Sequence, residues 1–222
     1  EALEANTTAA NNVAVGHQAL HDNTTGARCT AVGTNALADN TTANNNNAFG
    51  YQALLLNTIG ASNNAFGKSA LDANTTGSNH TAMGHNALGS NTTASNNTAF
   101  GYEALASNTT GAQNVAVGSK ALDNNTTGYN NVAVGFEALD TNTTAIQNIA
   151  IGYQSLKTNN ANSNTAVGHM TLRSNSTGTL NVALGLEPLY NNTTGIRNIA
   201  IGSPAMYSNR SEEHTSEPSH DQ

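Results

Sequence analysis

Glycine recurs at every seventeenth position along most of this chain, and this period constrains the fold more than any other feature of the sequence. The recurrent glycines stand at positions 16, 33, 50, 67, 84, 101, 118, 135, 152, 168, 185 and 202. All steps are equal except the step from Gly152 to Gly168, which is one residue shorter. A column of Asn from Asn6 to Asn209 has the same spacing and the same short step. One unit is therefore repeated along the chain, with one residue missing between Asn159 and Gly168.

The repeat has the consensus N-T-T-G-x-x-N-x-A-x-G-x-x-A-L-x-x, and we number its positions as slots 1 to 17. Slot 9 is Ala and slot 11 is Gly in all 12 copies, and slot 10 is always apolar and bulky. Slot 15 is Leu, with Met206 as the exception. Slots 12, 13, 16 and 17 accept polar, charged and aromatic residues. Strict and variable positions within one short unit indicate an interior and an exterior.

A unit of this length is too short for two packed helices, which need about 33 residues or more per repeat. The N-V-A-V-G segment alternates as a strand does, and N-T-T-G has the composition of a turn. The glycines of slots 4 and 11 are expected to supply positive φ or a close approach at two corners. We therefore predict an all-β fold, a parallel β-solenoid over residues 1–209. About 13 coils stacked at about 4.8 Å would form a rod roughly 60 Å long.

Two arrangements of slots 9 and 10 agree with a strand, in which neighbouring side chains point to opposite sides. In the first, the bulky slot-10 residues fill the coil and Ala lies on a flat outer face. In the second, Ala fills a narrow coil and slot 10 forms an outer apolar ridge. We favour the second arrangement. Because exposed apolar patches mark interfaces, we also expect self-association, as a trimer or as an end-to-end filament.

The N-x-A-x-G-x-x-A segment resembles the head repeats of trimeric autotransporter adhesins. The best-matching copies are residues 114–118 (N-V-A-V-G) and 148–152 (N-I-A-I-G). The full unit, as in residues 97–105, is also similar to repeat arrays of bacterial surface proteins and of phage or viral tail fibres. The longer unit and its N-T-T-G segment depart from the family pattern. The resemblance implies a left-handed parallel β-roll made of three chains, located extracellularly, on a cell surface or on a virion surface.

The slot-1 Asn residues begin N-x-S/T sequons in most copies. In a chain secreted by a eukaryote, ten of them would be candidate N-glycosylation sites. These are Asn6, Asn23, Asn40, Asn74, Asn91, Asn108, Asn125, Asn142, Asn175 and Asn192. The competing interpretation is that Asn and Thr stack, with amide ladders that hydrogen-bond from coil to coil. We favour stacking because it also explains the Asn of slot 7, which is seldom part of a sequon.

We expect a non-enzymatic protein without catalytic, cofactor-binding or metal-binding residues. His17, His85 and His169 share slot 12, but four or five coils separate them, roughly 20 Å or more at strand spacing. The Asp residues of slots 16 and 17 lack the Gly-Gly-x-Gly-x-Asp context of calcium-binding β-rolls. No Ser-His-Asp, Cys-His or paired-carboxylate set recurs in the sequence, and a rod of similar coils offers no asymmetric cleft.

Composition argues against two classes of partner. The chain has a formal net charge of -7 and only seven Lys and Arg residues, so no basic patch is available for nucleic acid. No run of about twenty apolar residues occurs, so no membrane span is expected. The only cysteine, Cys29, excludes an internal disulfide and is interpreted as an incidental small residue in slot 7. Residues 210–222 break the pattern and are expected to be a disordered tail or the translation of a sequencing adapter.

The sequence therefore favours a structural rod of an extracellular fibre or adhesin, serving as stalk or adhesive head. A host-surface or glycan receptor is a candidate further partner. The alternative is a ligand-binding solenoid that presents a regular Thr/Asn face to ice or glycan. Against it, the Thr residues of slots 2 and 3 are adjacent and would point to opposite sides of a strand. Because the chain opens within a repeat, we also expect a fragment of a longer array or a subunit that stacks on another copy.

Overall fold

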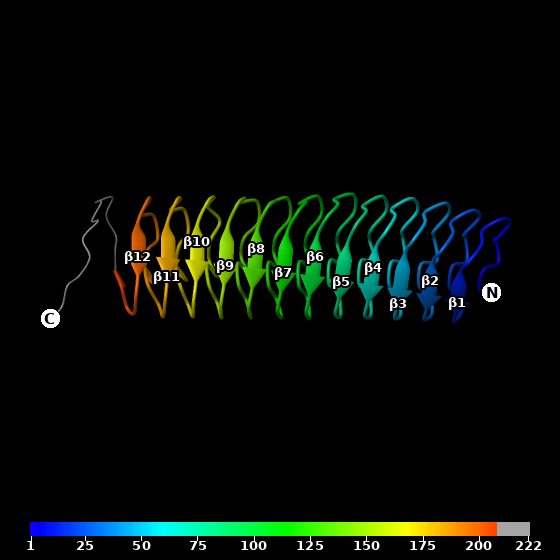
Figure 1. Ribbon diagram of the computed structural model, residues 1–222, viewed down its shortest axis with the longest axis horizontal. Coiled ribbons are helices and arrows are strands. Elements are labelled where there is room, and N and C mark those ends of the chain that lie inside the picture. Colours follow the sequence, from blue (N-terminus) through cyan, green and yellow to red (C-terminus); the bar gives the residue numbers. More distant parts are fainter. Residues whose placement is uncertain (208–222) are drawn as a thin grey trace.

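The computed structural model describes residues 1–207, which form a parallel β-solenoid (Figure 1). The strands stack in chain order into a single 12-stranded sheet, with β1 and β12 at opposite ends of the rod. They are β1 (Val13–Val15), β2 (Thr30–Val32), β3 (Asn47–Phe49), β4 (Asn64–Phe66), β5 (Thr81–Met83), β6 (Thr98–Phe100), β7 (Val115–Val117), β8 (Val132–Val134), β9 (Ile149–Ile151), β10 (Thr165–Val167), β11 (Val182–Leu184) and β12 (Ile199–Ile201). The predicted all-β solenoid with one strand per repeat is confirmed.

The described residues contain no helix, and therefore none that could cross a membrane. Asn209 and the predicted tail at 210–222 lie outside the described residues. We name each coil after its strand and count it from slot 1 to slot 17, so that coil β8 comprises residues 125–141.

The strands pair slot to slot along the whole rod. Ala14 pairs with Ala31, and this register continues across the missing residue, where Val167 pairs with Ile151. The deletion is absorbed in the turn that opens coil β10, because Asn159 Nδ2 donates to the carbonyl two residues ahead, whereas Asn23 Nδ2 donates three residues ahead. The expectation that the deletion would spare the strands is confirmed.

The interior is narrow and is filled by small side chains and Leu. The Ala of slot 9 is fully buried from Ala31 to Ala166, and so is the Leu of slot 15 from Leu20 to Leu189. The slot-10 side chains face outward, and Phe100 is 51% exposed. The second of the two arrangements, with Ala inside and the bulky residue outside, is therefore the one that the chain adopts.

The buried Leu column has an unusual backbone. Each slot-15 Leu has a positive φ, for example 53° at Leu122, in a region that residues other than Gly seldom occupy. Such a conformation costs about 1–3 kcal/mol, and burying a Leu side chain contributes about 1.5–3 kcal/mol. Leu122 N–H also donates to Ala138 O of the next coil at 3.0 Å. Burial and the inter-coil hydrogen bond therefore offset the strain, and the chain turns its corner at a Leu.

Replacing Ala116 by Leu should destabilise the rod by about 1–3 kcal/mol, because the fully buried slot-9 position has no room for a larger side chain. The matched control is Val117→Leu, which enlarges the next residue on the outward side of the same strand. Chemical denaturation measures the unfolding midpoint of both variants. Equal unfolding midpoints for the two variants would contradict the assignment of the interior.

Candidate functional site

Buried Asn side chains form a ladder inside the rod at slot 1. Asn125 Nδ2 donates to Asn108 Oδ1 of the preceding coil at 2.8 Å and to Gly128 O of its own turn at 3.0 Å. Asn142 repeats both bonds one coil later. A buried amide is costly unless its hydrogen bonds are made, and here each amide links its turn to the neighbouring coil. The N-T-T turn is therefore stacked by side chains as well as by backbone.

A second Asn ladder runs at slot 7, directly before each strand. Asn114 Oδ1 accepts the backbone N–H of Asn131 at 3.0 Å, and Asn114 Nδ2 donates to Gly128 O at 2.8 Å. Most slot-7 Asn side chains thus supply one acceptor and one donor to the next coil. The predicted amide ladders are confirmed at both slots.

The same geometry locates the ten sequon Asn residues. Asn6 at the end of the rod is half-buried, and the other nine are fully buried. An N-linked glycan would be attached to Nδ2, which at Asn125 is engaged in two hydrogen bonds inside the coil. A glycan on Asn125 would therefore have to displace both of these hydrogen bonds.

Cys29 replaces Asn in the slot-7 ladder. Its backbone N–H donates to Asn12 Oδ1 at 2.8 Å, and its Sγ lies 3.4 Å from Ala43 O. Burial raises the pKa of the Cys29 thiol, so the reactive thiolate is disfavoured. Cys29 is therefore a packed core residue.

The shortened coil β10 interrupts the slot-1 ladder. The side chain of Asn160 supplies the hydrogen-bond acceptor that the turn backbone supplies in other coils. Asn142 Oδ1 is buried and accepts no hydrogen bond within the described residues. In the other coils, a slot-2 carbonyl accepts hydrogen bonds from the preceding turn, as Thr143 O does from Thr126. In coil β10, Asn160 Oδ1 takes this role and accepts from Thr143 N, Thr143 Oγ1 and Thr144 N. The Asn in place of Thr at position 160 thus compensates for the missing residue.

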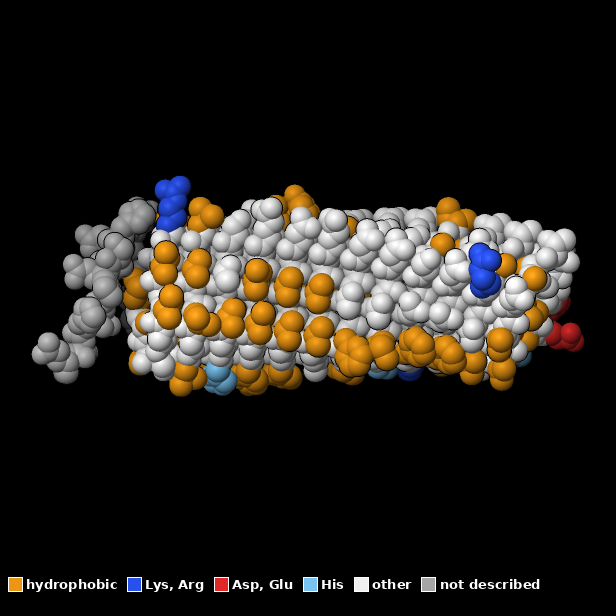
Figure 2. All heavy atoms as spheres, in the orientation of Figure 1, with side chains coloured by type: hydrophobic (Ala, Val, Ile, Leu, Met, Phe, Trp, Pro, Cys, Tyr) orange, Lys and Arg blue, Asp and Glu red, His pale blue; other side chains and the backbone are white. Residues whose placement is uncertain are grey.

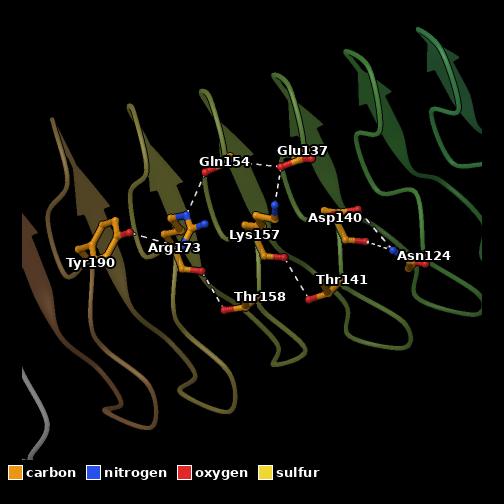
Figure 3. A network of polar contacts seen from close by, with 9 residues as sticks. All are labelled: Asn124, Glu137, Asp140, Thr141, Gln154, Lys157, Thr158, Arg173 and Tyr190. Carbon is orange, nitrogen blue, oxygen red and sulfur yellow. Dashed lines mark hydrogen bonds and ion pairs between the residues drawn. The ribbon is translucent and has the colours of Figure 1, made fainter.

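A network of polar side chains joins coils β8 to β11 on the outer surface (Figure 3). Lys157 Nζ and Gln154 Nε2 both donate to Glu137 Oε2, and the Lys157 bond lowers the pKa of the Glu137 carboxyl. Arg173 Nε donates to Gln154 Oε1 at 2.9 Å, and the Arg173 guanidinium lies 5.8 Å from the centre of the Tyr190 ring. The network spans the junction of coils β9 and β10, where the inner ladder is broken.

Sequence reasoning did not identify this network, although the sequence holds a signal for it. Glu137 and Gln154 both occupy slot 13, in successive repeats, so the period makes them neighbours on adjacent coils. Slots 13 and 16 vary among the repeats, so a comparison of single repeats does not show which polar side chains pair. The pairs become visible when the same slots of adjacent coils are aligned.

The outward slots 8 and 10 of β7 to β12 form an apolar surface that we call the strand face. Figure 2 shows two rows of apolar side chains over these strands, which become one row toward β3. The strand face consists of Val115, Val117, Val132, Val134, Ile149, Ile151, Thr165, Val167, Val182, Leu184, Ile199 and Ile201. All of these side chains except Thr165 are apolar, none is charged, and Ile201 is 68% exposed.

Aromatic residues and histidines border the strand face at slot 12. Phe136, Tyr153 and His169 stack in series, with ring centroids 5.5 Å and 5.2 Å apart. His85 stacks on Tyr102 in the same way. The structure therefore places these histidines in aromatic stacks on separate coils. Among the described residues, no group of three or more His, Cys, Asp and Glu side chains could hold a metal ion.

The Thr columns lie at the turn that opens each coil. Thr126 of slot 2 is half-buried, and its Oγ1 donates to Thr143 O at 3.0 Å. Thr127 of slot 3 is exposed. The expectation that the two Thr residues point to opposite sides assumed a strand, and this premise is wrong, because the segment is a turn whose inward positions are slots 1 and 4.

Comparison of the chain with protein-family models, with curated proteins and with solved structures found no match. The class of protein is therefore defined by the fold and its two internal ladders. The chain is a parallel β-solenoid repeat protein with an Asn-lined interior and one apolar outer face.

Proposed function

We propose that this chain is a structural, non-enzymatic rod of an extracellular fibre, on a cell surface or a virion surface, serving as a stalk or an adhesive head. The observation that carries the proposal is the continuity of the coils. The strands link each coil to the next, and the two Asn ladders reinforce most of these junctions, which gives an extended and laterally stiff element. The N-x-A-x-G resemblance supports the location outside the cell.

The rod self-associates through the strand face. An uncharged and partly exposed row of Val, Ile and Leu side chains on adjacent coils is unfavourable in water and is typical of an interface. Its regular spacing suits a partner with the same repeat, because each outer row can then pack between the rows of the other copy. A second copy of this chain provides that spacing.

The test is the mass of the protein in solution, measured by sedimentation over a range of concentrations. We expect the wild type to be an oligomer and Ile151→Asp to be a monomer, because the new carboxylate would be buried without a partner in the interface. The control Thr127→Asp introduces the same charge at an exposed turn position and should leave the mass unchanged. A wild type that stays monomeric at the highest concentration would contradict self-association.

The alternative is a ligand-binding solenoid whose regular Thr/Asn face holds ice or glycan. The exposed slot-3 Thr column favours it, since Thr25, Thr42, Thr76, Thr93, Thr110, Thr127 and Thr144 all stand on the outside of the rod. The adjacent slot-2 hydroxyls are already engaged with backbone carbonyls, so the free hydroxyls form a single column and not a flat array. Thermal hysteresis in solution would favour this alternative over the structural rod.

A further inference from the structure

His80 occupies a position in the slot-7 ladder that Asn takes in most other coils. It is 1% exposed. Its backbone N–H donates to Asn63 Oδ1 of coil β4 at 3.0 Å. Its ring bridges coils β5 and β6, because Nδ1 lies 3.2 Å from Asn97 N and Nε2 lies 2.6 Å from Ala94 O. The imidazole thus replaces both the acceptor and the donor of an Asn side chain.

The partners fix the protonation state of the ring. The backbone N–H of Asn97 can only donate, so Nδ1 must accept and carry no proton. The carbonyl of Ala94 can only accept, so Nε2 must carry the proton. Asn91 Nδ2 also lies 3.2 Å from Nε2, but its two hydrogens are donated to Asn74 Oδ1 and Ala94 O. The ladder therefore requires the neutral imidazole. A second proton would be placed on Nδ1, facing the Asn97 N–H, where two donors would meet in a buried site.

We propose that His80 makes the junction between coils β5 and β6 an acid-sensitive joint, which opens when the imidazole is protonated while the junctions held by Asn stay closed. Asn cannot be protonated in this range, so the slot-7 ladder of Asn is indifferent to mild acid. A single His in the column therefore concentrates the response to pH at one place in the rod.

The sign of the effect follows from burial. Desolvation lowers the pKa of His80 below its ordinary value of 6.5 in the closed joint, whereas an opened joint restores that value. The open state therefore binds the proton more readily. The closed joint is fully stable above about pH 6.5 and loses stability as the pH falls below it.

No ionisable side chain of the adjacent coils hydrogen-bonds to the His80 ring. The candidates on coils β4 to β6 are Lys68, His85 and Tyr102, which are exposed in slot 12, and Asp72 and Glu103, which are partly exposed in slots 16 and 13. Burial raises the pKa of the Asp72 carboxyl, so mild acid favours its folded form and acts against the opening. Protonation of His80 would therefore be the cause of an acid-induced opening at this junction.

The test is amide hydrogen exchange of the full chain at pH 7.5 and pH 5, corrected for the intrinsic pH dependence of exchange. We expect amides of coils β5 and β6 to exchange up to about 30-fold faster at pH 5, since an opened histidine with a pKa of about 6.5 is mostly protonated there. Amides of coils β7 and β8 should exchange at an unchanged corrected rate.

The matched variant is His80→Asn, which restores the residue of the column and should fold. It is expected to abolish the acid response at coils β5 and β6, whereas His85→Asn, at an exposed slot-12 position, should retain it. The proposal is overturned if His80→Asn keeps the response, or if the wild type opens uniformly along the rod. Neither outcome bears on the mass in solution, so the structural role proposed above is tested separately.

Discussion

Replacing Gly118 by Ala is expected to destabilise the rod by about 2–6 kcal/mol, through backbone strain and overpacking together. Gly118 has a φ of 131°, and a Cβ built on it would lie 2.5 Å from Gly135 O and 2.7 Å from Gly135 C. The backbone conformation costs about 1–3 kcal/mol for a residue with a side chain, and the overpacking against the next coil adds about 1–3 kcal/mol. The first contribution comes from the positive φ of slot 11, and the second from the close contact between the backbones of successive coils.

The measurement is chemical denaturation, with hydrogen exchange to locate the damage, because repeat arrays can unfold in parts. The matched control is Gly128→Ala in slot 4. That slot also lies close to the next coil but does not require positive φ, and the array itself places Ala there at Ala43, Ala94 and Ala145. We expect the control to lose much less stability. Equal losses would show that crowding alone, and not backbone conformation, restricts slot 11.

The columns without exceptions in the sequence predicted the interior well. Ala in slot 9 and Gly in slot 11 do not vary among the repeats, and the structure gives the reason: one fills a narrow core, and the other has a positive φ beside a neighbouring backbone. The period determines the parallel register, since residues of the same slot pair on adjacent coils. The shortened coil keeps the same register, since Val167 pairs with Ile151. A strand that had slipped by one residue would have placed these two side chains on opposite faces.

Other features could not be predicted from local preference. Leu disfavours positive φ in isolation, so the Leu corner at Leu122 depends on burial that only the stacked coils provide. His80 was recognisable as an exception in an Asn column, but its role depends on which atoms of the next coil face each ring nitrogen. The partners of the two ring nitrogens can be read from the three-dimensional structure but not from the composition of the repeat.

Two sets of side-chain hydrogen bonds at coil β10 show how the repeat array accommodates a deletion. Inside the coil, Asn142 Oδ1 loses its partner, and in the exposed part of the turn the Asn160 side chain replaces a backbone carbonyl. Outside, Arg173 Nε donates to Gln154 across the same junction, and Thr158 Oγ1 donates to Arg173 O at 2.8 Å. Side-chain bonds thus replace part of what the shortened backbone cannot supply. The stack of coils is therefore continuous across the repeat that lacks one residue.

Replacing Asn125 by Ala is expected to cost about 2–5 kcal/mol, because it removes a hydrogen-bond partner from each of two buried polar groups. The change removes the donor from Asn108 Oδ1 and the acceptor from Asn142 Nδ2, both buried, and each such group costs about 1–3 kcal/mol. The control is Asn124→Ala, one residue earlier. Asn124 is exposed and its amide donates to Asp140 in contact with water, so its loss should cost less than about 1 kcal/mol.

Asn142→Ala supplies a sharper comparison, because this residue sits at the break in the ladder. Its Nδ2 makes the same two bonds as that of Asn125, but its Oδ1 accepts nothing within the described residues. The variant therefore loses one hydrogen bond fewer and should be more stable than Asn125→Ala by about 1 kcal/mol. Denaturation midpoints of the two variants measure this difference. If Asn142→Ala proved the more damaging, the amide ladder would not be what holds the N-T-T turns together, and packing of the side chains would have to carry that role.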